Sequence, residues 1–175
     1  MTQTENTVLN SDRITARQAF DRFFTPPRKS GTELEQKFEA EADIFIVPGE
    51  STDLNVYSWG EGETILMVHG WGGRATQLYS FIEPLVKLGY RVLAFDAPAH
   101  GKTAGTQTNV LEFVKAIKTV VKKSGAIDSI IAHSLGSAAT MIALDEGLVA
   151  RKVVCLGSDC YVSATVKTFA KLAKY

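Results

Sequence analysis

The chain has 175 residues, with 19 basic and 19 acidic side chains and a hydrophobic fraction of 45%, which is typical of one globular domain with a sizeable core. Without an excess of positive charge, the composition argues against a nucleic-acid partner or an anionic membrane surface. Cys155 and Cys160 are too few for a disulfide framework. We find no signal peptide and no apolar run of about 20 residues, so we expect reduced thiols, a cytoplasmic location and no membrane association.

The first part of the sequence predicts an extension that precedes the sheet. Residues 1–10 are polar and predict no regular structure. Residues 13–24 place Ile and Phe side chains at helical spacing, and a Pro-Pro pair at 26 and 27 ends that helix. We expect this helix to dock through its aromatic face. The charged stretch 31–40 predicts a second short helix or a solvated surface.

Strand and helix patterns then follow one another. Two short strand-like runs, 44–47 and 54–59, flank a Pro-Gly turn and predict an antiparallel hairpin. The next run, 64–69, is apolar without alternation, which indicates a strand that is covered on both faces. Beyond it, helices and strands alternate, and this predicts an α/β fold with a mixed, mostly parallel sheet and helices on both faces. The expected helices are 77–88, 110–123 and 135–145, and the expected strands are 91–95, 127–132 and 153–156.

The stretch around Ser134 carries the strongest functional signal. A β-branched strand stops at Ser134, and a helix of small residues follows at once, which matches the nucleophile-elbow pattern G-x-S-x-G with Ala132 at the first glycine position and Gly136 at the second. The helix that begins at Leu135 points its free N–H groups at the reacting centre, and these groups favour an oxyanion. The simpler alternative is an ordinary strand-to-helix junction capped by Ser134.

Two further loops follow predicted strands and belong at the same edge of the sheet. The segment 69–73, His-Gly-Trp-Gly-Gly, is rich in glycine, which allows a backbone N–H to approach a substrate oxygen closely. The segment 96–103, Asp-Ala-Pro-Ala-His-Gly-Lys-Thr, follows the next strand. Open α/β sheets place their sites at the carboxyl ends of the strands, so we expect the three motifs to meet there.

These three motifs resemble those of the α/β-hydrolase superfamily over residues 54–158. The resemblance implies that Ser134 is the nucleophile and that the backbone N–H groups of Trp71 and Leu135 form the oxyanion hole. It implies a supporting role, shaping the site, for four neighbours, His69, Gly70, His133 and Gly136. The sequence departs from the family pattern in having Ala132 and Ala99 where glycine is usual, but neither change removes a catalytic group.

The larger departure concerns the base. The family order is serine, acid, histidine, yet no histidine follows His133 in this sequence. His100 is the one remote substitute, and Asp159 could be the acid, although a surface loop aspartate is the commoner interpretation. We therefore expect a hydrolase whose C-terminal part, with the acid and the base, is missing. Such a chain would be nearly inert, and the edge of strand 153–156 would invite self-association.

The resulting division has an N-terminal extension (1–30), a partial α/β-hydrolase core (31–163) and the start of a cap helix (164–175). The predicted function is hydrolysis of carboxylic esters or related small acyl substrates, without metal or cofactor. Two alternatives stay open. One is a binding protein that keeps the pocket without the chemistry. The other is a phosphate-binding loop at Gly101, Lys102 and Thr103, which the pattern disfavours because Asp96 stands where a glycine is required.

Overall fold

The computed structural model describes residues 14–158 together with Lys167 and Lys171. Asp159, Cys160, residues 1–10 and most of the predicted cap helix lie outside the described residues. The elements, in chain order, are α1 (Ala16–Phe24), α2 (Glu33–Ala40), β1 (Asp43–Val47), β2 (Leu54–Trp59), β3 (Glu63–Val68), the 3₁₀ helix η1 (Ala75–Phe81), α3 (Ile82–Lys87), β4 (Tyr90–Phe95), α4 (Val110–Ser124), β5 (Ser129–His133), α5 (Leu135–Asp145) and β6 (Lys152–Leu156).

The strands of the described region form one sheet in the order β1-β2-β4-β3-β5-β6. β1 pairs antiparallel with β2, and β2 pairs antiparallel with β4. The pairs β3–β4, β3–β5 and β5–β6 are parallel. The predicted hairpin and the predicted mixed, mostly parallel sheet are both confirmed.

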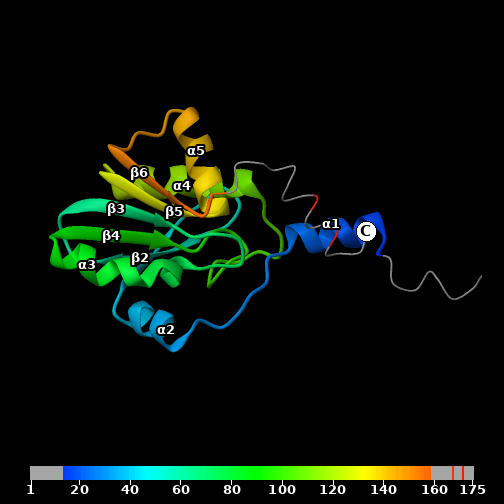
Figure 1. The fold of residues 1–175 in the computed structure, drawn as a ribbon, viewed down its shortest axis with the longest axis horizontal. Coiled ribbons are helices and arrows are strands. Elements are labelled where there is room, and N and C mark those ends of the chain that lie inside the picture. The colour runs from blue at the N-terminus through cyan, green and yellow to red at the C-terminus, as the bar shows by residue number, and fades with distance from the viewer. Residues whose placement is uncertain (1–13, 159–166, 168–170, 172–175) are drawn as a thin grey trace, which may run out of the picture.

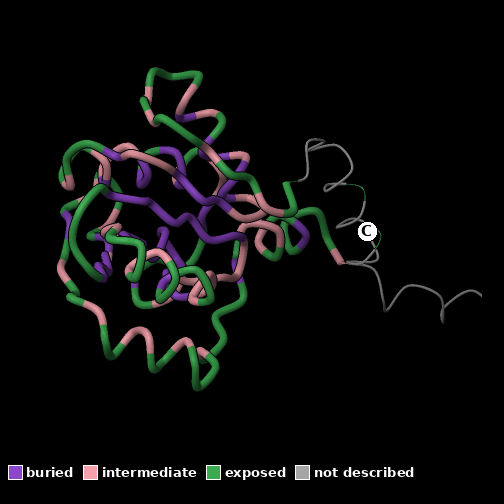
Figure 2. The backbone as a smooth tube through the Cα atoms, turned by 60° about the vertical axis from the view of Figure 1, so that its left-hand side comes forward, coloured by how far each residue is buried: buried purple, intermediate pink, exposed green. Residues whose placement is uncertain are grey.

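Helices cover both faces of this sheet, as predicted. In Figure 1, α4 and α5 lie above the strands, while α2 and α3 lie below them. On β3, Leu66 and Val68 face the cluster beneath α4 and α5, whereas Ile65 and Met67 face the cluster that contains Ile82 of α3. This two-sided burial explains why β3 reads as a continuous apolar run. Figure 2 shows the same concentration of buried residues along the central strands.

One predicted helix is built differently. The expected helix 77–88 is a 3₁₀ helix, η1, followed by the short α3, with a break at Leu78 (φ −101°, ψ 28°). Pro84 explains where α3 begins, because a proline lacks the N–H of a helix interior and fits only within a first turn.

The N-terminal helix α1 begins after Thr15, whose side chain forms a capping box with Gln18. Its aromatic rings pack on one another, with the Phe20 and Phe24 centroids 4.5 Å apart. Phe20 nevertheless stays 52% exposed, and Figure 1 shows α1 extending away from the sheet. The prediction that this helix docks through its aromatic face is therefore wrong for Phe20.

In the described part of the chain, β6 is the edge strand at the end of the sheet opposite to β1. Val154 is 49% exposed there, and Cys155 is an exposed free thiol. Self-association through this edge stays a prediction. Among the described helices, none has the length and apolar character needed to cross a bilayer.

Candidate active site

Ser134 stands in a strained turn between β5 and α5. Its φ of 50° and ψ of −119° lie outside the regions that a non-glycine residue normally occupies. Its backbone N–H donates to the Leu156 carbonyl at the end of β6 (2.9 Å), and its carbonyl accepts from the Ser137 N–H (2.9 Å). The predicted strand, sharp turn and helix are present. Such strain persists only where the surroundings hold it, and it is typical of functional sites.

Glycines at two positions let the glycine-rich loop approach this turn. A Cβ on Gly136 would overlap the His69 carbonyl oxygen and lie 2.8 Å from the Val68 carbonyl oxygen. A Cβ on Gly70 would lie 3.0 Å from the Ser134 Cβ and 2.9 Å from the His133 Nδ1. The loop 70–73 and Ser134 are therefore in direct contact, as the motif spacing predicts.

Most backbone N–H groups of the loop 70–73 already have a hydrogen-bond acceptor. Gly70 donates to the Gln77 side chain (2.9 Å), Gly72 donates to the His100 ring (2.9 Å), and Gly73 donates to the Gly70 carbonyl (3.1 Å). Within the described residues, the Trp71 N–H has no acceptor. Leu135 is the first residue of α5, so its N–H has no partner inside the helix. Both N–H groups that are predicted to form an oxyanion hole therefore lack an acceptor in the part of the chain that the structure describes.

Both His69 and His100 are buried and use both ring nitrogens. His69 Nδ1 donates to the Gly70 carbonyl (2.7 Å), since a carbonyl can only accept, and His69 Nε2 accepts from the Ala97 N–H (3.0 Å). Burial, together with the nearby His100 ring, lowers the pKa of His69 to about 3. His69 therefore stays neutral at pH 7 and joins the loop at Gly70 to the start of the third motif loop at Ala97.

His100 is held in the same way, which corrects its prediction as a substitute base. Its Nδ1 donates to the Pro98 carbonyl (3.0 Å), and its Nε2 accepts from the Gly72 N–H. The ring is 1% exposed, and burial lowers the pKa of His100. A base needs a free nitrogen lone pair within reach of the serine proton, and His100 has none. His133 differs, because its buried Nδ1 has no partner among the described residues.

Asp96 organises the third motif loop from a buried position. Its carboxylate accepts from the Ala75 N–H (2.7 Å), the Lys102 N–H (2.8 Å) and the Tyr57 hydroxyl (3.0 Å). Burial raises the pKa of Asp96, and these hydrogen bonds oppose that rise. A Cβ on Gly101 would overlap this carboxylate. Of the N–H groups that a phosphate-binding loop would offer here, that of Lys102 binds Asp96 and those of His100 and Thr103 bind backbone carbonyls, which argues against nucleotide binding.

The third motif loop also contains Ala99, which stands where the family usually has glycine. Ala99 has a φ of 64°, in the left-handed region that glycine adopts without strain. Its methyl group is buried, at 1% exposure. Ala132, the other departure, is fully buried in β5 and its carbonyl accepts the Ser137 hydroxyl (2.8 Å).

Gln77 is a site residue that the sequence patterns did not reveal. Its side-chain oxygen holds the Gly70 N–H, and its amide group would lie within 3.0 Å of a Cβ on Gly73. No sequence pattern around Gln77 indicates that its side chain binds the Gly70 N–H. No group of three or more His, Cys, Asp or Glu side chains in the described part of the chain is placed to hold a metal ion.

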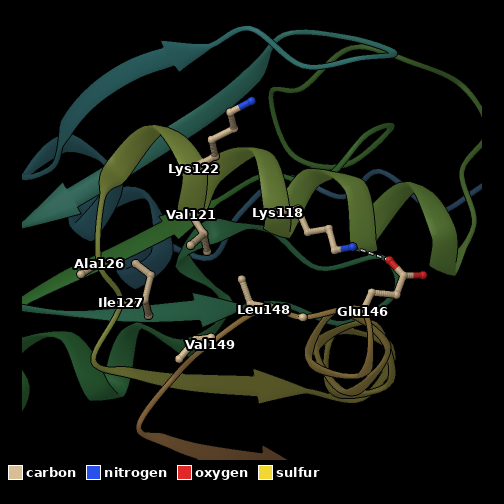
Figure 3. Close-up of a pocket in the computed structure, with 9 residues that line it drawn as sticks. Lys118, Val121, Lys122, Ala126, Ile127, Glu146, Leu148 and Val149 are labelled. Atoms are coloured by element: carbon tan, nitrogen blue, oxygen red, sulfur yellow. Dashed lines mark hydrogen bonds and ion pairs between the residues drawn. The ribbon is translucent and has the colours of Figure 1, made fainter.

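A cavity of about 450 Å³ lies at the other edge of the sheet, away from the three motif loops (Figure 3). It is lined by the C-terminal half of α4, the residues that lead into β5 and the loop that follows α5. Because these segments precede the strands, the cavity faces the amino ends of β5 and β6. None of the predicted site residues lines it.

Comparison with known proteins agrees with this geometry. Residues 65–173 match the model of the "Alpha/beta hydrolase family". The chain is 36% identical over 98 residues to a 2-hydroxy-6-oxononadienedioate/2-hydroxy-6-oxononatrienedioate hydrolase of Klebsiella pneumoniae subsp. pneumoniae, covering 51% of this chain and 32% of that protein. It is 30% identical over 95 residues to a non-heme haloperoxidase of Rhodococcus erythropolis, covering 53% and 35%. The chain thus spans about a third of the length of these relatives.

Solved structures share the fold. The Pyrococcus furiosus esterase Pf2001 superposes with a TM-score of 0.69 at 26% identity, over 86% of this chain and 65% of that one. The Vigna radiata epoxide hydrolase VrEH1 superposes with a TM-score of 0.65 at 21% identity, over 76% and 46%. With the family model covering residues 65–173 and the strand order and motif loops described above, the chain belongs to the α/β-hydrolase family.

Proposed function

We propose that the chain acts as a serine hydrolase on carboxylic esters or related acyl substrates, with Ser134 as the nucleophile. The observation that carries the proposal is the strained Ser134 turn, held in contact with a glycine loop whose Trp71 N–H has no acceptor among the described residues. A serine nucleophile favours acyl chemistry, and the similarity to the Pyrococcus furiosus esterase supports an ester as the first substrate to test.

In this proposal, the Ser134 hydroxyl attacks the acyl carbonyl, and the Trp71 and Leu135 N–H groups stabilise the oxyanion that forms. Loss of one such donor typically costs about 100-fold to 1,000-fold in turnover. His69, Gly70 and Gly136 keep the loop against the turn, and His133 lines the contact with Gly70. The tetrahedral intermediate then collapses to the acyl-enzyme as the ester C–O bond breaks, and the alcohol leaves with the proton that the serine lost. Water next attacks the acyl-enzyme, the acid departs, and a proton from that water returns to Ser134.

The base that activates Ser134 is not assigned. His69 and His100 have no free ring nitrogen, and the described residues place no other histidine than His133 beside the serine. Without a base, the oxyanion hole and binding alone accelerate hydrolysis by about 10³-fold to 10⁴-fold over water. The test of the proposal must therefore supply a base from outside.

The experiment measures p-nitrophenyl acetate and butyrate hydrolysis with and without added imidazole, for the chain and for Ser134→Ala. Imidazole is a small general base, so it can take the place of a missing histidine. We expect a Ser134-dependent rate that rises with imidazole, after subtraction of the rate that Ser134→Ala shows at the same imidazole concentration. Equal rates for both proteins at every imidazole concentration would contradict the proposal.

The engaged histidines also favour a second candidate, a binding protein that retains the site without the chemistry. Equal hydrolysis rates combined with tight binding of an acyl ligand would identify it. A competitive spin-label or fluorescence displacement assay with butyrate and butyramide would measure that binding, and Gly70→Val, which fills the contact between the loop and Ser134, would abolish it.

A further inference from the structure

The segment that joins α1 to α2, residues 25–31, crosses the edge of the sheet where the motif loops meet. We call it the strap. In Figure 1 it is the blue segment that runs from α1 to α2, past the end of the sheet toward which β4 points. The sequence patterns gave this segment no role beyond ending a helix with two prolines.

Arg28 is the centre of the strap. Its guanidinium donates to three backbone carbonyls of one loop, those of Gly101 (3.0 Å), Thr103 (2.6 Å) and Gly105 (3.0 Å). A planar guanidinium with five N–H donors can serve three acceptors at once, which a lysine ammonium cannot reproduce in the same geometry. The loop 101–105 directly follows His100 and includes Lys102, whose N–H holds Asp96.

The strap also touches the loop that carries Trp71. A Cβ on Gly72, which has a φ of +68°, would lie 2.9 Å from Pro27 Cγ, so the proline ring packs directly on that glycine. Arg74, at the end of the same loop, donates to the Lys29 carbonyl. The strap therefore contacts both motif loops, 70–74 and 101–105, from one side.

The two loops are coupled to each other beneath the strap. The Gly72 N–H donates to the His100 Nε2, and the Trp71 and His100 rings meet edge to face at 5.5 Å. A shift of the loop 101–105 would therefore be transmitted to Trp71 through His100. The strap joins the two loops a second time, because Pro27 packs on Gly72 and the adjacent Arg28 binds the loop 101–105.

We propose that Arg28 is a positioning residue, which fixes the loop 101–105 and, through the adjacent Pro27, the orientation of the Trp71 N–H toward Ser134. Its catalytic consequence rests on the proposed function, since the Trp71 N–H matters only where an oxyanion forms. Arg28 touches no substrate in this scheme and acts entirely through the two loops.

The test compares Arg28→Ala and Arg28→Lys with Arg17→Ala, a matched control on α1 whose side chain is 82% exposed and forms an ion pair with Asp21. Amide hydrogen exchange, read by mass spectrometry, reports on the loops without requiring activity. We expect Arg28→Ala to speed exchange about tenfold in peptides covering 70–76 and 100–106, with α4 unchanged. Arg28→Lys should recover less than half of that loss, and Arg17→Ala should match the unmodified chain.

The second readout is the Ser134-dependent hydrolysis in the presence of imidazole. We expect Arg28→Ala to lower kcat about tenfold while KM changes by less than twofold, because the strap positions an oxyanion donor and not the ground-state substrate. Unchanged exchange in both loops, or equal acceleration in α4, would overturn the proposal. So would faster loop exchange with an unchanged kcat. If the unmodified chain shows no Ser134-dependent hydrolysis, the proposed function fails, and the exchange data alone decide the role of Arg28 in holding the loops.

Discussion

The two edges of the sheet use glycine for different purposes. At the carboxyl edge, a Cβ on Gly70, Gly101 or Gly136 would lie within about 3 Å of neighbouring atoms of Ser134, Asp96 or the β3 carbonyls. At the amino edge, Gly89, Gly125 and Gly147 follow helices with φ values of +82°, +89° and +94°, and a Cβ there would meet nothing within 4 Å. After these three helices glycine supplies only a backbone angle, whereas at the carboxyl edge, and in the turn 60–62 before β3, it supplies close approach.

The same division appears in the polar groups. At the carboxyl edge, His69, Asp96 and His100 are buried and held by backbone hydrogen bonds. At the amino edge, the charged groups form exposed pairs such as Lys118 with Glu146. Close packing and buried polar groups are expensive, so their concentration at one edge marks where the fold maintains a specific geometry.

The largest expected effect comes from Gly136→Ala, because the added methyl group would collide with the backbone of β3 and push α5 off the sheet. We expect a loss of about 3 kcal/mol in the free energy of unfolding. Gly147→Ala, just beyond the end of the same helix, should cost only about 1 kcal/mol, from its positive φ. Urea denaturation of both variants checks this. Similar losses would erase the distinction between the two edges.

The buried histidines predict an acid sensitivity that the exposed amino edge cannot produce. The pKa of His69 is about 3 in the folded chain and about 6.5 when unfolded, so the unfolded state binds more protons between those values. Stability is therefore complete above pH 6.5 and falls by up to about 1.4 kcal/mol per pH unit below it. His100, whose pKa is also lowered by burial, adds to this loss, while the raised pKa of Asp96 opposes it.

Urea midpoints measured at pH 7, 6 and 5 test this acid dependence. The expected result is a steady decrease that begins near pH 6.5. A midpoint that stays constant over this range would mean that the two histidines are not held neutral, and the distinction between buried and exposed polar groups would be lost.

The smallest expected effect is at the amino edge. Glu146→Gln removes the ion pair with Lys118, whose partners are 47% and 38% exposed, and should change the free energy of unfolding by less than about 0.5 kcal/mol. Thermal denaturation of this variant next to the unmodified chain is sufficient. A loss of more than about 1 kcal/mol in the free energy of unfolding would show that the amino edge of the sheet is as tightly organised as the carboxyl edge.

The sequence was most informative where one local rule decides the structure. The apolar run of β3 predicted a strand covered on both faces, and the small residues around Ser134 predicted a strained turn at a close crossing. The helix 77–88 was harder, because the first-turn preference of Pro84 outweighs the helical spacing around it.

The site was predictable only in part, since its supporting contacts are tertiary. Arg28 meets carbonyls more than 70 residues away in the sequence, and Gln77 binds a loop N–H that no spacing rule connects to it. His100 was a reasonable substitute base by elimination, yet burial and two backbone hydrogen bonds occupy both of its nitrogens. Residue type and spacing identify the motif loops, whereas only the structure shows which hydrogen bonds hold their side chains.

The most direct test of the central claim is labelling with a fluorophosphonate in the presence of imidazole, because this reagent captures a serine that can attack an electrophile. Intact mass and peptide mapping would be compared for the unmodified chain, Ser134→Ala and the control Ser137→Ala. We expect a single adduct on Ser134, absent in Ser134→Ala and retained in Ser137→Ala. No adduct at saturating reagent, or an adduct on another residue, would contradict the assignment of Ser134 as the nucleophile.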